Sequence, residues 1–343
     1  MRSKTFLTVA AMAALMSASG GAGAQETHTI TMHVPETFKS RTTIASDNAQ
    51  TMQGRTTQTH SKIVMLTDMR KTADGYHATL NFESADIKMD GDNGTPQAAM
   101  AAKMSGLMTS VGRVEATYDK DLTPIRIDNM EDIKAKIKAA MTDDADAQKK
   151  AAGEAVYNMM FANLTPESAA KFLKQMKQAN MVFNRPLPLG VEVPMSGDPI
   201  SLMGSTFRMS GTIKLTAWTE GKSAHLVYTI APTDEDMHAF VTGMLKNMVD
   251  RLAEGQDDKA KEMMGRMFDS MKMHMVSTCD IDVDLANTVN SQGDCTTHTD
   301  MTMDLRKMLT DEQLKASPQL ANQLQVISMT QTGHTVTSSV VIN

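Results

Sequence analysis

The stretch Met271–Met303 constrains the fold of this chain most, because it alternates in polarity along two arms and carries both cysteines. Odd positions are mostly methionine, cysteine, threonine or aliphatic, even positions mostly charged or polar, and alternate side chains of a strand share a face. If Cys279 faces Cys295, the register is fixed and the turn centres on Asn287. The facing pairs are then Met271 with Met303, Met273 with Met301, and His274 with Asp300. The sequence therefore predicts a β-hairpin closed by a disulfide.

Residues 1–24 have the layout of a secretory signal peptide. Arg2 and Lys4 precede an apolar run, and small residues end at Ala24, after which we expect cleavage. No cysteine stands near that site for lipid attachment, so we expect a soluble periplasmic or secreted protein, in a compartment where cysteines pair. No later apolar run is long enough for a membrane-spanning helix, so no transmembrane segment is expected.

The rest of the chain reads as two similar halves, residues 25–182 and 195–343. In each half a hairpin with an acidic-Gly turn, Asp74-Gly75 or Glu220-Gly221, precedes a methionine-rich amphipathic helix and a second hairpin. Residues 183–194 contain three prolines and a glycine, which suits a connector. A last hairpin is expected to turn at Gly333. These patterns predict an α+β fold, each half a curved, half-barrel-like antiparallel sheet covered by amphipathic Met-rich helices.

The connector sequence Phe183-Asn184-Arg185-Pro186-Leu187-Pro188-Leu189-Gly190 resembles the Phe, Pro and Gly pattern at the midpoint of an exported bacterial family of unknown function. The Tyr118-Asp119 strand, followed by Pro124–Ile127, is similar to that family's layout, as is the late hairpin around Asn287. In the family an aspartate and a tryptophan tend to follow the glycine, whereas this chain has Val191–Val193 there. The resemblance implies β-rich halves around a helical middle, and it brings no catalytic residues.

Strong enzyme signatures are absent from the sequence. It has no Gly-x-Ser-x-Gly elbow, no His-Glu-x-x-His pair and no phosphate-binding glycine loop, and both cysteines are assigned to a disulfide. The formal net charge of −6 at pH 7 argues against a nucleic-acid partner, which would require a basic surface. We therefore expect no enzyme activity, no cofactor and no nucleic-acid binding, and nothing in the sequence indicates an oligomeric state.

Methionine stripes on two expected helices suggest a binding function. Met100, Met104 and Met108 repeat every four residues, and Met237, Met244 and Met248 share one face of a later helix. Such stripes most often seal a helix onto a sheet, but methionine also forms adaptable apolar binding surfaces. A curved sheet under such helices resembles, in architecture, periplasmic carriers that hold lipidated proteins or acyl chains under a helical lid. These methionines are thus candidate contacts for an apolar small molecule or lipid.

A metal is the alternative ligand. Met271, Met273, His274 and Met275 combine thioether and imidazole groups, which suit monovalent copper. In a strand, however, His274 points away from Met273 and Met275, so packing inside the sheet is the favoured interpretation. The alternative functions are a Met-rich copper-binding or oxidant-buffering periplasmic protein, whose methionines are ligands or sacrificial sulfurs, and an envelope structural protein without a ligand.

Overall fold

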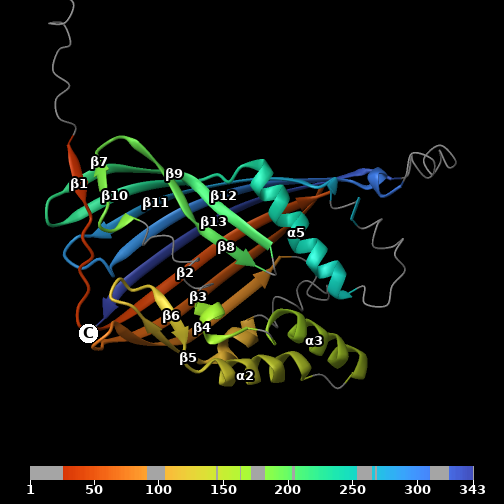
Figure 1. Ribbon diagram of the computed structural model, residues 1–343, viewed down its shortest axis with the longest axis horizontal. Helices are drawn as coiled ribbons and strands as arrows, with labels where there is room; N and C mark the ends of the chain where they lie inside the picture. Colours follow the sequence, from red (N-terminus) through yellow and green to blue (C-terminus); the bar gives the residue numbers. More distant parts are fainter. Residues whose placement is uncertain are drawn as a thin grey trace, which may run out of the picture.

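The computed structural model describes residues 26–90, 105–143, 146–162, 164–170, 182–202, 205–252, 265–266, 269–309 and 324–342. It contains one 11-stranded antiparallel sheet with the strand order β6-β5-β4-β3-β2-β13-β12-β11-β10-β9-β8 (Figure 1). Neighbours in the sheet are neighbours in the sequence everywhere except at the junction of β2 and β13. A separate two-stranded sheet pairs β1 (Thr27–Thr29) with β7 (Pro186–Pro188).

Two runs of consecutive strands build the large sheet. The first run comprises β2 (Thr37–Met52), β3 (Arg55–Lys71), β4 (Tyr76–Met89), β5 (Arg113–Tyr118) and β6 (Pro124–Ile127). The second comprises β8 (Glu192–Leu202), β9 (Ser205–Thr219), β10 (Ser223–Ile230), β11 (Lys272–Asp284), β12 (Ser291–Asp304) and β13 (Val326–Ile342). With 16, 17 and 17 residues, β2, β3 and β13 are roughly three times as long as an average strand.

The two runs join where β2 pairs with β13, from Lys39–Ile342 to Met52–Met329. The predicted α+β fold, with a separate helix-covered sheet in each half, is therefore wrong: the protein is mainly β, with one continuous sheet. The physical reason is the edge of each half. A separate sheet would leave a long row of unpaired backbone N–H and C=O groups on β2 and on β13, and their mutual pairing satisfies both rows.

The labelled helices are few and lie toward the margins of the sheet (Figure 1). They are α2 (Met130–Thr142), α3 (Ala147–Met160) and α5 (Asp234–Leu252), and a short 3₁₀ helix, η2 (Leu305–Met308), follows directly after β12. α5 begins shortly after Ile230, the last residue of β10. It contacts β9 and β11, the two strands on either side of β10. Its start is capped by Thr233, whose Oγ1 accepts a hydrogen bond from the backbone N–H of Asp236 at 3.1 Å.

The apolar clusters can be placed on one or the other face of the sheet. We call the face that carries Cys279 and Cys295 the inner face and the opposite one the outer face. A first cluster joins inner-face residues such as Met69 and Ala78 to Ile133 of α2, and a second surrounds Leu226. A third, small cluster consists of Val241 of α5 and Met271, with four partly buried side chains packed against them: Phe240, Met273, Met301 and Met303.

The tight turns only partly follow the sequence prediction. Gly221 has φ +64°, as the predicted turn at Glu220-Gly221 requires, but Gly75 does not have a positive φ. A Cβ atom at Gly75 would lie 2.1 Å from the carbonyl oxygen of Tyr118, so the close approach of two backbones requires glycine there. The predicted turn at Gly333 is wrong, because Gly333 lies inside β13 and pairs with residues of β12 and β2.

Candidate functional site

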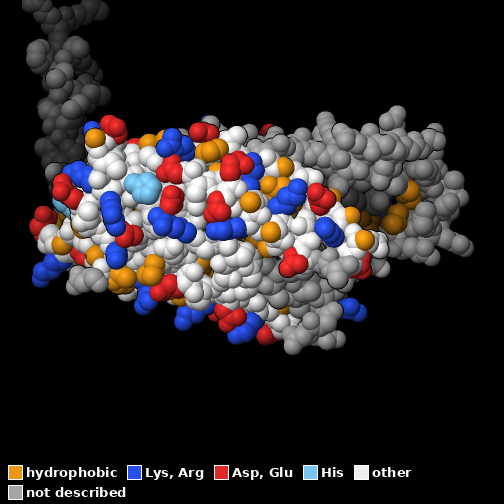
Figure 2. Space-filling view, turned by 90° about the horizontal axis from the view of Figure 1, so that it is seen from below, with side chains coloured by type: hydrophobic (Ala, Val, Ile, Leu, Met, Phe, Trp, Pro, Cys, Tyr) orange, Lys and Arg blue, Asp and Glu red, His pale blue; other side chains and the backbone are white. Residues whose placement is uncertain are grey.

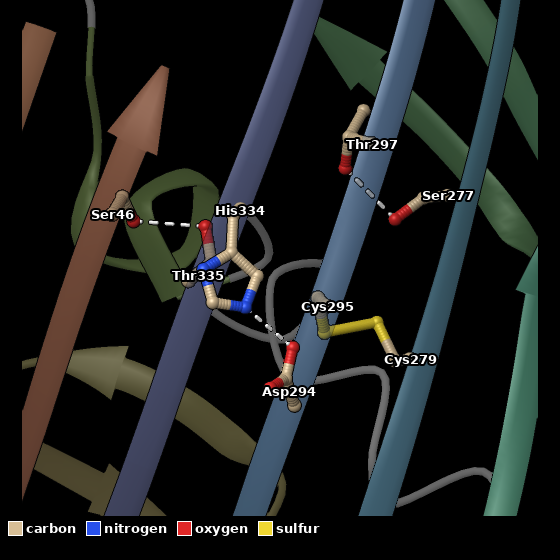
Figure 3. The surroundings of a disulfide bond; sticks show 8 residues. All are labelled: Ser46, Ser277, Cys279, Asp294, Cys295, Thr297, His334 and Thr335. Carbon is tan, nitrogen blue, oxygen red and sulfur yellow. Dashed lines mark hydrogen bonds and ion pairs between the residues drawn. A yellow bond between two sulfur atoms is a disulfide. The ribbon is translucent and has the colours of Figure 1, made fainter.

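The disulfide joins Cys279 of β11 to Cys295 of β12, and this confirms the predicted pairing (Figure 3). The two cysteines are direct cross-strand partners, and the predicted pairs Met273–Met301 and His274–Asp300 are also in register. Hydroxyl pairs flank the bond on the inner face. Ser277 Oγ lies 3.0 Å from Thr297 Oγ1, and Ser46 Oγ lies 2.8 Å from Thr335 Oγ1. The middle of the inner face is therefore polar and half-buried.

Beside this polar middle, the inner face carries an apolar surface that we call the inner apolar strip. It consists of five half-buried side chains on β2, β3 and β4: Ile44, Ile63, Met65, Phe82 and Ile87. Ile44 faces Ile63, and Met65 faces Phe82 across β3 and β4. Within the described residues, none of the five belongs to any of the three apolar clusters. The strip is thus a continuous apolar surface outside the described cores.

The first methionine stripe is only partly described. Met100 and Met104 lie outside the described residues, and Met108 is half-buried in a helical segment over residues 105–111. The hydroxyl of Ser105 in that segment donates a hydrogen bond to the backbone carbonyl of Ala85, whose strand carries Phe82 and Ile87. The structure therefore brings Ser105 of this segment to β4, beside the inner apolar strip.

The second stripe belongs to α5. Met237 is 3% exposed and so is part of the core, while Met244 and Met248 lie within the helix and their side chains are outside the described part. Val241 of the same helix packs with Met271 in the third apolar cluster. The use of Met237, Met244 and Met248 as ligand contacts stays a prediction.

The predicted cluster of Met271, Met273, His274 and Met275 is split between environments. Met271 is buried and Met273 and Met275 are half-buried on the inner face, whereas His274 is exposed. His274 Nδ1 lies 2.8 Å from Asp234 Oδ1 at the start of α5. Among the described residues no group of three or more His, Cys, Asp or Glu side chains is placed to hold a metal ion.

A different set of methionines does lie side by side. Met52 of β2 pairs with Met329 of β13, Met329 with Met301 of β12, and Met301 with Met273 of β11. We call these four residues the methionine ladder. Directly facing residues of antiparallel strands have Cβ atoms about 4.5–5.5 Å apart, so the four side chains are neighbours on the inner face. Sequence reasoning found the Met273–Met301 pair but missed Met52 and Met329, because the pairing of β2 with β13 has no local signal.

The outer face has an open depression of about 520 Å³ that crosses β3, β2, β13, β12 and β11. Residues around it include His60, Asp47, His298, His334, Thr278 and Thr296. The three histidines around this depression, His60, His298 and His334, could not be grouped from the sequence, because they come from three different strands and β3 is far from β12 and β13 along the chain. Parity within each strand is the only signal that they share a face.

Carboxylates engage the outer-face histidines. His60 Nδ1 lies 2.5 Å from Asp47 Oδ1 and its Nε2 lies 3.4 Å from Asp90 Oδ2, and these hydrogen bonds raise the pKa of His60. His298 Nε2 lies 2.8 Å from Asp300 Oδ2. Hydrogen bonds from Thr330 and His298 lower the pKa of Asp300. The Asp47–His60 pair joins neighbouring strands and the His298–Asp300 pair lies along β12, and both occupy imidazole nitrogens that could otherwise bind a ligand.

Charge on the rest of the surface is mixed. On the face seen in Figure 2, acidic and basic side chains alternate among uncharged ones instead of gathering by sign. None of the helices in the described ranges combines the length and the apolar character that crossing a membrane would need.

Comparisons with known proteins add little to this picture. No family model and no curated protein matches the chain. Among solved structures, the crystal structure of Pseudomonas aeruginosa OpdQ is similar at 6% sequence identity, covering 90% of this chain and 100% of that one. The TM-score of 0.24 is too low to indicate function.

Proposed function

We propose that this protein is an exported binding or carrier protein that takes up an acyl chain, or a similarly elongated apolar ligand, against the inner apolar strip. One observation carries the proposal: Ile44, Ile63, Met65, Phe82 and Ile87 adjoin one another on the inner face and stay half-buried outside the apolar clusters. A contiguous apolar surface that stays partly open to solvent is typical of ligand and partner sites.

The size and shape of the strip suit an acyl chain. Ile63 and Met65 lie two residues apart on the same face of β3, and Phe82 and Ile44 extend the surface to the strands on either side. A methylene group transferred from water to such a surface contributes up to about 0.8 kcal/mol, so a chain of several methylenes binds without a charged anchor. The signal-peptide layout predicted from residues 1–24 supports export, and a disulfide is typical of an oxidising compartment.

Binding of the fluorescent fatty acid cis-parinaric acid tests the proposal. We expect one saturable site in the mature protein, and affinity at least tenfold weaker in the double variant Ile63→Ser/Phe82→Ser, because two large apolar contacts are lost. Val336→Ser is the matched control, since Val336 is 42% exposed on the outer face. Circular dichroism and thermal unfolding establish that each variant is folded.

Two results would contradict the proposal. One is the lack of saturable binding by the folded mature protein after delipidation. The other is equal affinity in the folded Ile63→Ser/Phe82→Ser variant and in Val336→Ser, which would place the probe elsewhere on the molecule.

A further inference from the structure

We propose that the methionine ladder, Met52, Met329, Met301 and Met273, is a binding site for monovalent copper. The proposal goes beyond the apolar-ligand function, because it uses other residues. Ile44 of the inner apolar strip and Met52 of the ladder lie eight residues apart on β2, which corresponds to about 26 Å along a strand. Either site can therefore fail without the other.

The ladder is more open than a row of core methionines. Met52 is 48% exposed, and Met329, Met301 and Met273 are half-buried, whereas the neighbouring Met271 is 8% exposed in the third apolar cluster. Met52 and Met329 belong to none of the three described clusters. Packing between a sheet and a helix accounts for Met273 and Met301, which contact the α5 cluster, but among the described residues it does not account for Met52 and Met329.

One sulfur of the ladder already has a polar partner. The side-chain amide of Gln50 donates a hydrogen bond from Nε2 to Met329 Sδ at 2.7 Å. Thioether sulfur is only a weak acceptor, so this contact shows that a lone pair of Met329 is turned toward a polar group and not toward apolar side chains. This hydrogen bond uses one of the two lone pairs of the sulfur, and the second lone pair remains for a metal ion.

The chemistry of the row selects a soft monovalent ion. Thioethers are soft, uncharged ligands that favour Cu⁺ over hard ions such as Mg²⁺ or Ca²⁺. Gln50, Gln331 and Thr299, next to the ladder on the inner face, are uncharged. Arg55 pairs with Met52 at the hairpin end of β2 and adds positive charge. A divalent ion would find no carboxylate among these neighbours to balance its charge.

The geometry lets several sulfurs reach one ion. Facing residues on adjacent strands have Cβ atoms about 5 Å apart, and methionine has three rotatable side-chain bonds that carry the sulfur beyond Cβ. Sulfurs from three adjacent strands can therefore converge on a single ion without a change in the backbone. The ladder thus offers an all-thioether site, unlike the sequence-predicted set around His274, whose imidazole is bound to Asp234.

Silver titration of the mature protein with its disulfide intact tests the site, because Ag⁺ mimics Cu⁺ and needs no reductant. We expect one tightly bound Ag⁺ per chain in native mass spectrometry. In Met301→Leu/Met329→Leu the affinity for Ag⁺ should be lower by a factor of at least about ten, which is the smallest loss of metal affinity expected when ligands are removed. The matched control is Met69→Leu/Met195→Leu, which removes two buried methionines that are 4% and 7% exposed. Methionine-to-leucine exchanges nearly conserve volume, so both variants should fold.

A single variant and a spectrum complete the test. Met52→Leu changes an exposed side chain at the hairpin end, so it should weaken Ag⁺ binding without affecting stability. X-ray absorption of the Cu⁺-loaded protein should show only sulfur in the first coordination shell. Equal Ag⁺ affinity in Met301→Leu/Met329→Leu and in the control, or nitrogen and oxygen neighbours of copper, would overturn the proposal.

Discussion

Replacing both cysteines, as Cys279→Ala/Cys295→Ala, should destabilise the protein mainly through its unfolded state. The bond closes a loop with a sequence separation of 16, for which the chain-entropy model gives about 3 kcal/mol. That corresponds to roughly a hundredfold decrease in the ratio of folded to unfolded molecules. The hairpin itself should persist, because β11 and β12 keep their backbone pairing from Lys272–Thr302 to Val283–Ser291.

Urea denaturation of the wild-type protein and of the double variant measures this effect. We expect a lower midpoint, a slope nearly unchanged because the released loop is short, and the same strand signal in circular dichroism for both proteins before unfolding. Wild-type protein reduced with dithiothreitol should behave like the variant. A loss well above 5 kcal/mol, or a reduced strand signal in the native variant, would show that the disulfide holds the register of the strands. An unchanged midpoint would refute the entropic reasoning altogether.

Three further substitutions probe other features. Gly75→Ala should lower the thermal stability by more than the few tenths of a kcal/mol typical of a surface substitution, because the new Cβ would clash with the Tyr118 carbonyl. Stability equal to that of the wild type would contradict that contact. The Asp47 hydrogen bond raises the pKa of His60, so this pair stabilises the fold fully below the unfolded-state pKa of about 6.5, and the stabilisation is lost as pH rises through the higher folded value. The stability difference between wild type and His60→Gln should therefore shrink from pH 5.5 to pH 8.5 in urea titrations. A difference that grows over this range would contradict the stabilising role of the protonated His60. Tyr228→Phe should stabilise the protein by about 1–3 kcal/mol in the same assay, because the buried Tyr228 hydroxyl has no hydrogen-bond partner among the described residues, and a loss of stability would reveal one.

Local alternation in the sequence was sufficient for the stapled hairpin. Residues of β11 and β12 lie close in sequence, so once Cys279 faces Cys295 every other pair follows, including His274 with Asp300. The same reasoning placed the turn near Asn287, between the ends of the two strands. The hydrogen-bond partners of these side chains were harder to predict than the register of the strands. His274 is hydrogen-bonded to Asp234 of α5, and Asp300 is hydrogen-bonded to His298.

Contacts between distant segments could not be predicted. Thr42 and Ser339 are hydrogen-bonded across 297 residues of chain, and nothing in either strand identifies the other. The two-sheet prediction, the false turn at Gly333 and the missed members of the methionine ladder all follow from that one unseen pairing. Gly75 illustrates a different limit. The sequence placed a glycine in the turn, but the reason that glycine is required there is the close approach of the Tyr118 carbonyl.

The pairing of β2 with β13 also sets the order in which the sheet can be completed during synthesis. β2 and β3 emerge early and can form their hairpin at once, but the free edge of β2 waits for residues 326–342, almost 300 positions later. Such non-local pairing slows folding, and a long unpaired edge invites association with other chains in the interval. A molecule that lacks β13 would hold two exposed edges of nearly full strand length. Export of an unfolded chain, followed by folding of the whole chain after release, would keep that interval short.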